Sequence, residues 1–256
     1  MNGRPAPGLR WASIPLWVPV AFLLTWQAVV WLRMLDPIFF PPPTRLLEVG
    51  ASLAANGELV RDLAATLSRC AVGFAIGASL GLVWGVLMGF WAPLRRAFEP
   101  VINALYTTPK MTLLPLLMLL VGVGNSARLS LVALGVFLIV VINTVDGVRN
   151  VDPHYVELAV NYGANQRNVI RHVYLPASLP AVFTGLRLGL GRALVTTITI
   201  ELVSSTDGLG AMVWRAWQTF TPEKLYVGVL LSACLGMLFH NILRAAERRL
   251  SPWREK

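Results

Sequence analysis

Three charged side chains stand inside an apolar stretch of the chain, where they could bind an ion or pair with one another. Arg187, Arg192 and Glu201 are the only charged residues of segment 179–203. A charge in apolar surroundings is costly unless it faces water, a counter-charge or a ligand. The spacing leaves two interpretations open: contact with a solute, or salt bridges that hold helices together.

Neutral polar side chains in two earlier apolar stretches could belong to the same site. Hydroxyl and amide groups at such positions can line a water-filled path through an otherwise apolar protein. The candidates are Asn103, Tyr106, Thr107 and Asn143.

A motif typical of hydrolases is also present. Residues 77–81 read GASLG and match G-x-S-x-G, so Ser79 and the later His240 could in principle form an intramembrane serine protease. The glycines offer another interpretation, because they belong to a stripe repeated at every fourth position. Such a stripe lies on one face of a helix and lets a second helix pack closely, with Ser79 as a small packing residue. The stripe consists of Gly73, Gly77, Gly81, Gly85 and Gly89.

The composition of the chain places all these residues in a membrane protein. Only 14% of the 256 residues are charged and the mean hydropathy is +0.62, whereas soluble domains contain about 25% charged residues. Cys70 and Cys234 lie in or beside apolar runs and are expected to act as small hydrophobic residues, not as a disulfide or metal site.

Long uncharged or nearly uncharged stretches predict an all-α, polytopic integral membrane protein with a single domain, 1–256. A helix needs about 20 apolar residues to cross the hydrocarbon core. Pro109 and Pro115 predict that the third span is bent, and that its freed carbonyl groups find other partners. About six transmembrane helices are predicted, at residues 14–32, 67–90, 101–123, 129–145, 179–203 and 225–243.

The distribution of basic residues predicts the orientation of these spans. With a cytoplasmic amino terminus, thirteen Lys and Arg residues lie on the inner side and six on the outer side. Cytoplasmic loops are enriched in Lys and Arg. We therefore expect a multi-pass protein of the bacterial inner membrane with both termini in the cytoplasm, and the net charge of +9 requires no nucleic-acid partner.

Residues 150–176 form a long polar loop on the predicted cytoplasmic side. Asp152 and Pro153 are a capping residue and a first-turn proline, and Gly163 stands where a left-handed residue would end the helix. A second short helix is predicted to begin at Asn165 and to end at Pro176. One interpretation, which requires no partner protein, is a pair of amphipathic helices lying flat on the membrane surface.

The spacing within this loop resembles the "EAA" loop of permease subunits of bacterial ABC importers. The family pattern is E-A-A, three residues, G, nine residues, I-x-L-P, and here Leu158 and Val173 replace the first alanine and the isoleucine. In that family the loop docks as a coupling helix on an ATPase subunit. The resemblance therefore assigns coupling to Glu157, Leu158, Ala159, Gly163, Leu175 and Pro176.

Longer segments resemble the permeases for nitrate, taurine and alkanesulfonates in the same order along the chain. They include TPKMTLLPLLMLLVGVGNSARL, LPASLPAVFTGLRLGLGRAL and ELVSSTDGLGAMV, and Arg192 departs from that subfamily. The resemblance implies a type I ABC importer permease fold. It also implies partners: cytoplasmic ABC ATPase subunits, a second permease copy that forms a homodimer with this chain, a periplasmic or lipid-anchored substrate-binding protein, and membrane lipid.

The chain lacks the G-x-x-x-x-G-K-[ST] loop of nucleotide-binding proteins, so no cofactor is expected in it. ATP and Mg²⁺ are expected on the partner ATPase, and the chain is expected to be a transport subunit, not an enzyme. A secondary transporter is the other candidate, although no inverted repeat is visible. Arg69, Arg187 and Arg192 against Glu201 favour a small anionic solute.

Overall fold

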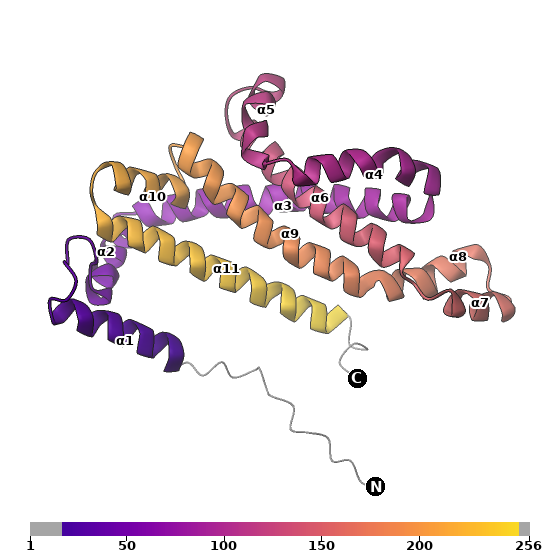
Figure 1. The fold of residues 1–256 in the computed structure, drawn as a ribbon, viewed down its shortest axis with the longest axis horizontal. Coiled ribbons are helices and arrows are strands. Elements are labelled where there is room, and N and C mark those ends of the chain that lie inside the picture. The colour runs from indigo at the N-terminus through magenta and orange to yellow at the C-terminus, as the bar shows by residue number, and fades with distance from the viewer. Residues whose placement is uncertain (1–16, 251–256) are drawn as a thin grey trace, which may run out of the picture.

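The structure, a computed structural model, describes residues 17–250, with side chains from 18 to 246. Within these residues every regular element is a helix, which confirms the predicted all-α class. Four long helices run roughly along the longest axis of the molecule (Figure 1). They are α3 (Glu58–Phe90), α6 (Asn125–Arg149), α9 (Leu175–Ser204) and α11 (Pro222–Leu250).

Shorter helices precede the long helices along the chain or connect them. The loop helices α7 and α8 lie at one end of the bundle, here named the α7 end, and α10 lies at the opposite end, named the α10 end (Figure 1). The short elements are α1 (Trp17–Trp31), α2 (Pro43–Ala55), α4 (Ala92–Thr107), η1 (Lys110–Leu113), α5 (Leu114–Val121), α7 (Pro153–Asn161), α8 (Gln166–Val169), η2 (Ile170–Tyr174) and α10 (Leu209–Gln218).

Each long helix contains one predicted span and extends beyond it. The largest difference is in α3, which begins nine residues before the predicted start at residue 67. Asp62 and Thr66 in this extension are buried, because they form hydrogen bonds inside the protein that hydropathy alone does not reveal. The sequence did not predict helices α2 and α10, since neither is long or apolar enough to resemble a span.

Three described helices are long and apolar enough to cross a membrane: α3, α6 and α11 as far as Ala246. The bent pair α4 and η1–α5 adds a fourth if it forms one broken span. The span predicted at 14–32 corresponds to α1, which has only 15 residues, and its predicted start lies outside the described residues. The number six remains a prediction.

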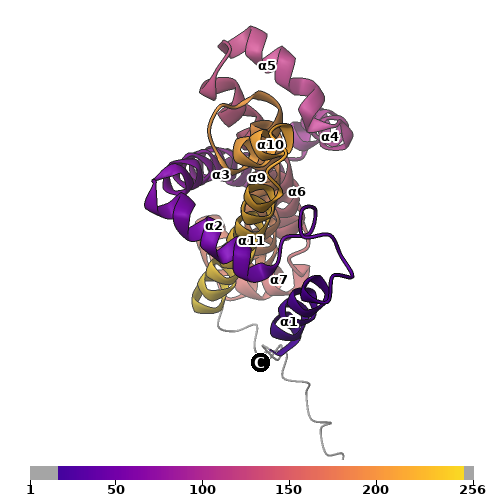
Figure 2. The same ribbon diagram turned by 90° about the vertical axis from the view of Figure 1, so that its left-hand side faces the viewer.

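The bend predicted in the third span is confirmed. The two halves meet at 105°, at Thr108 and Pro109, because the residue before a proline avoids the helical conformation. The Lys110 ammonium donates hydrogen bonds to the carbonyl oxygens of Leu105, Tyr106 and Thr108, at 2.7 to 2.8 Å. This side chain provides the partners that the broken helix needs, and α5 projects away from the bundle (Figures 1 and 2).

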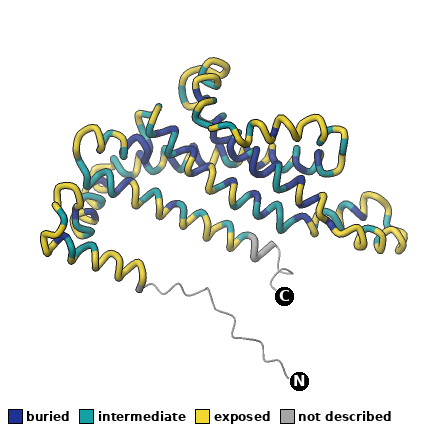
Figure 3. The backbone as a smooth tube through the Cα atoms, viewed as in Figure 1, coloured by how far each residue is buried: buried dark blue, intermediate teal, exposed yellow. Residues whose placement is uncertain are grey.

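The most extensive helix contact joins α3 to α6, and it follows the glycine stripe. A Cβ atom added to any of the five glycines would lie 2.5 to 2.8 Å from a side-chain carbon of α6. The α6 partners recur at the same four-residue spacing, so the two helices meet along their length, and α6 is largely buried (Figure 3). These partners are Val132, Val136, Val140, Thr144 and Val148.

Helix α9 approaches α6 from another side, again through small residues. An added Cβ on Gly185 would lie 2.7 Å from the Cβ of Asn143, and one on Gly147 would lie 2.8 Å from the Cβ of Ala181. Helix α6 therefore lies against both α3 and α9. Helix α1 contacts α11 through the rings of Trp26 and Tyr226, whose centres lie 5.5 Å apart.

The glycine contact generates a prediction about stability. Gly77→Ala is expected to lower the free energy of unfolding by about 1–3 kcal/mol, the usual cost of overpacking, because the new methyl group would overlap the backbone carbonyl of Ala133. Ser79→Ala is the matched control on the same helix, since Ser79 is exposed. Thermal unfolding of the purified protein in detergent measures both variants. An unchanged melting temperature for Gly77→Ala would show that the contact is looser than described.

Candidate functional site

A groove between α4, α6 and α9 brings together three of the polar candidates. Its volume is about 400 Å³, within the range of small-molecule sites. Tyr106 comes from α4, Asn143 from α6 and Arg192 from α9, although the sequence separates them widely. The remaining lining residues are apolar or glycine: Ile139, Ile142, Leu188, Gly191 and Val195.

The charge of this groove is positive. Arg192 is exposed, and none of the eight lining residues is acidic. The Lys110 ammonium lies 5.7 Å from the centre of the Tyr106 ring, so it adds a second positive charge beside the groove. The Asn143 side-chain amide donates a hydrogen bond to the carbonyl oxygen of Ile139 at 2.8 Å. The groove can therefore attract an anion.

The other polar candidates lie elsewhere. Asn103 lines a separate, smaller hollow beside Glu99 and Asp146. The Thr107 hydroxyl donates to the carbonyl of Ala104 within its own helix at 3.0 Å. Arg187 is half-buried on α9 and is not among the residues that line the groove.

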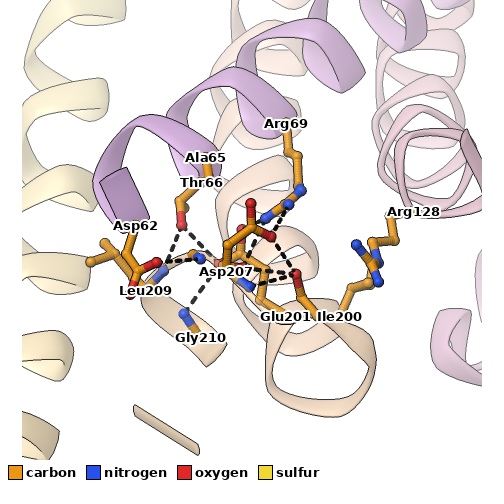
Figure 4. Close-up of polar contacts among 12 residues, drawn as sticks. Asp62, Ala65, Thr66, Arg69, Arg128, Ile200, Glu201, Asp207, Leu209 and Gly210 are labelled. Carbon is orange, nitrogen blue, oxygen red and sulfur yellow. Dashed lines mark hydrogen bonds and ion pairs between the residues drawn. The ribbon is translucent and has the colours of Figure 1, made fainter. Parts of the chain in front are cut away.

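Glu201 belongs to a buried ion pair at the α10 end. Its carboxylate is fully buried and lies 2.8 Å from the Arg69 guanidinium, which also contacts Asp207 and donates to Asn125 at 2.9 Å (Figure 4). Arg128 lies beside this cluster and donates to the carbonyl of Ser204. The sequence left two interpretations open for Glu201, and the structure supports the second: Glu201 forms a salt bridge that holds α9 to α3.

The same cluster holds the amino terminus of α10. The first amides of a helix lack partners within the helix, and its positive dipole end attracts carboxylates. Asp62 accepts a hydrogen bond from the Gly208 amide at 3.1 Å, and Thr66 accepts one from Leu209 at 2.8 Å. Glu201 accepts one from Gly210 at 3.1 Å (Figure 4). Side chains of α3 and α9 thus fix the start of α10.

Sequence reasoning missed most of this cluster, although one signal was available. Asp62, Thr66 and Arg69 are spaced at i, i+4 and i+7, which places them on one face of α3. The loop before α10 supplies Asp207, and its hydrogen bond with Arg69 holds the pKa of the Asp207 carboxyl below its ordinary value. Asp207 is therefore ionised at neutral pH and balances part of the local positive charge.

The caps predicted for the polar loop are confirmed. The Asp152 carboxylate accepts a hydrogen bond from the His154 amide at 2.9 Å, and Pro153 begins α7. Gly163 has a φ of 83°. Its amide donates to Val160, and the Ala164 amide donates to Ala159, both at 2.9 Å. This pair of bonds is the Schellman motif, in which a left-handed glycine ends a helix.

The second helix of the loop begins as predicted but does not end at Pro176. The Asn165 side chain accepts a hydrogen bond from the Asn168 amide at 2.9 Å and caps α8. Helix α8 then continues through η2, a π-helix, directly into α9. A proline can stand in the first turn of a helix because its missing N–H group is not needed there. Pro176 therefore lies at the start of α9 and interrupts nothing.

The pattern residues of the loop are unevenly exposed. Glu157, Leu158, Gly163 and Leu175 are exposed, whereas Ala159 and Pro176 are half-buried. Tyr162, beside the left-handed glycine, is 89% exposed. A surface of this kind, with a large aromatic side chain in water, suits contact with another protein.

Comparisons with known proteins place the whole chain among transport components. The family model described as "Binding-protein-dependent transport system inner membrane component" matches residues 77–252. A Bacillus subtilis (strain 168) protein named for aliphatic sulfonates transport, the permease SsuC, is 34% identical over 239 residues, which are 93% of this chain and 87% of that protein. The taurine transport system permease protein TauC of Escherichia coli (strain K12) is 31% identical over 252 residues, covering 96% and 92%.

Solved structures share the fold. A chain of the MetNI methionine ABC transporter matches with a TM-score of 0.67 at 21% identity, covering 75% of this chain and 95% of that one. A chain of an amino acid ABC transporter matches with a TM-score of 0.62 at 19% identity, covering 78% and 97%. At these identities the similarity establishes the fold alone.

The buried ion pair generates a second prediction. Glu201→Gln is expected to lower the free energy of unfolding by about 3 kcal/mol, because removing one member of a buried pair leaves the other charge poorly compensated. Glu48→Gln is the matched control, since Glu48 pairs with Arg45 on the surface, where ion pairs contribute little. Thermal unfolding at neutral pH compares the two. Equal melting temperatures would contradict the structural role assigned to Glu201.

Proposed function

The chain belongs to the family of binding-protein-dependent transport system inner membrane components, and we propose that it carries a small anion past the groove between α4, α6 and α9. It is a transmembrane permease subunit of an ABC importer, a transport component and not an enzyme. The protease and secondary-transporter interpretations are not supported. The family implies an ATPase, a substrate-binding protein and a dimeric arrangement.

The observation that carries the proposal is the position of Arg192. An exposed guanidinium in a groove without an acidic lining residue lowers the energy of an anion and raises that of a cation. Tyr106 and Asn143 provide polar groups beside it, while the apolar walls can face the rest of an organic solute. We propose that a second permease copy, which the family implies, completes the path.

The named relatives support the same class of solute. One is named for aliphatic sulfonates and the other for taurine, both of which contain an anionic sulfonate group. A sulfonate offers three oxygen acceptors to a guanidinium, which donates hydrogen bonds in a planar fork. We therefore propose a small anion of the sulfonate, taurine or nitrate type as the transported solute.

The polar loop is proposed as the docking site for the ATPase subunit. Its exposed α7 surface and left-handed Gly163 agree with the EAA pattern, and the basic residues around it favour a cytoplasmic position with both termini on the same side. ATP and Mg²⁺ would bind to the ATPase. Glu157, Leu158 and Gly163 are the proposed contact residues at this end.

A third prediction tests the docking role of Gly163. Gly163→Val should reduce solute uptake per ATP hydrolysed about tenfold in a reconstituted complex, because a β-branched residue strains the left-handed conformation and displaces the neighbouring contact surface. Gly57→Val is the matched control, since Gly57 has a φ of 79° and equally open surroundings but precedes α3. Normal coupling in Gly163→Val would refute the docking assignment.

A fourth prediction tests the solute charge. Arg192→Ala should lower anion uptake about tenfold, as expected for the loss of a charge-assisted hydrogen bond, with little change in melting temperature because Arg192 is exposed. Arg192→Lys keeps the charge and should retain part of the activity. Reconstituted vesicles loaded with a sulfonate-binding protein measure uptake. Transport of a polyamine, or unchanged anion uptake in Arg192→Ala, would rule out this path.

A further inference from the structure

A ring contact joins the loop region to the end of α3. The centres of the Phe90 and Tyr174 rings are 5.0 Å apart, and the rings meet edge to face at 77°. Phe90 is the last residue of α3. Tyr174 is the last residue of η2, immediately before α9. Edge-to-face pairs at this distance are favourable beyond the apolar area that they bury.

The position of Tyr174 matters because η2 is an unusual connection. The π-helix is rare, packs less regularly than an α-helix and often marks a functional site. In η2 the Leu175 amide donates to the carbonyl of Ile170, five residues earlier. Along the backbone, α7 and α8 connect to α9 through this segment, where the wider turn can absorb part of a displacement of the loop. The Tyr174 ring provides a second route, directly to α3.

The part of α3 that precedes Phe90 is packed closely against α6. The preceding residue, Gly89, packs against Val148 of α6, and the glycine contacts continue along the length of α3. At the α10 end, the Arg69–Glu201 ion pair ties α3 to α9. The two helices are therefore connected at both ends, by the aromatic contact and by the ion pair, with α6 packed against each of them.

We propose that Tyr174 is a positioning residue that transmits displacement of the docking loop to α3, through its contact with Phe90. The proposal rests on the docking function proposed above. Through this contact α3, α6 and α9 move as one unit when the loop moves, and Asn143 on α6 and Arg192 on α9 keep their relative positions. Without it, bending at η2 separates movement of the loop from movement of the groove.

The test measures solute uptake per ATP hydrolysed in the complete reconstituted transporter. Tyr174→Ala and Phe90→Ala should each lower this ratio by about three- to tenfold, the range expected for one aromatic pair, while ATP hydrolysis continues. Tyr174→Phe keeps the ring and should preserve the ratio. The double variant should be no worse than either single variant, because both remove the same contact.

A second aromatic pair serves as the control. The rings of Trp84 and Phe98 lie 5.1 Å apart and join α3 to α4, away from the docking loop. Phe98→Ala removes a contact of similar size and should leave the ratio unchanged. Because Phe90 lies outside the loop, Phe90→Ala tests the contact even if Tyr174→Ala prevents assembly.

The outcomes separate this inference from the docking proposal. A normal ratio in Phe90→Ala, or losses that multiply in the double variant, would overturn the role of the ring contact. If Gly163→Val still uncouples transport in that case, docking at the loop stands and only the transmission route is wrong. If Gly163→Val is also normal, the docking proposal fails as well.

Discussion

The close packing of α3 on α6 is the constraint on which the remaining structure depends. Five glycines allow the helices to approach until side chains of α6 occupy the space where Cβ atoms would otherwise stand. In a membrane, where apolar surfaces gain little by leaving lipid, such contact is a principal source of helix association. It fixes the face of α6 that remains for α9, and with it the position of Asn143 beside Arg192.

Polar interactions complete what the glycine contact begins, and they are concentrated at the α10 end. Asp62, Thr66 and Glu201 are buried, yet each accepts a hydrogen bond from the start of α10. Arg69 compensates the charge of Glu201 and Asp207. Buried polar groups of this kind are tolerable only when they are paired. Their pairing makes the turn between α9 and α10 part of the rigid framework.

The charged residues of the apolar helices consequently have different roles. Glu201 has a structural role, since its hydrogen-bond partners Thr66, Arg69 and Gly210 belong to the cluster. Arg192 lies on the exposed side of the same helix and faces the groove. Helix α9 thus contributes to the buried ion pair near its end and carries the proposed anion contact nearer its middle. At its beginning, Tyr174 and η2 connect it to the loop proposed to meet the ATPase.

The sequence by itself determined the features that depend on neighbouring residues. The bend at Pro109, the cap at Asp152, the left-handed Gly163 and the spacing of the glycine stripe all arise within a few turns of chain. Only the tertiary structure decided that Glu201 pairs with Arg69, 132 positions away, because hydropathy and periodicity do not identify the partner of a buried charge. Likewise, only the structure showed that Pro176 begins α9 instead of ending the loop helix, because a proline is compatible with both positions.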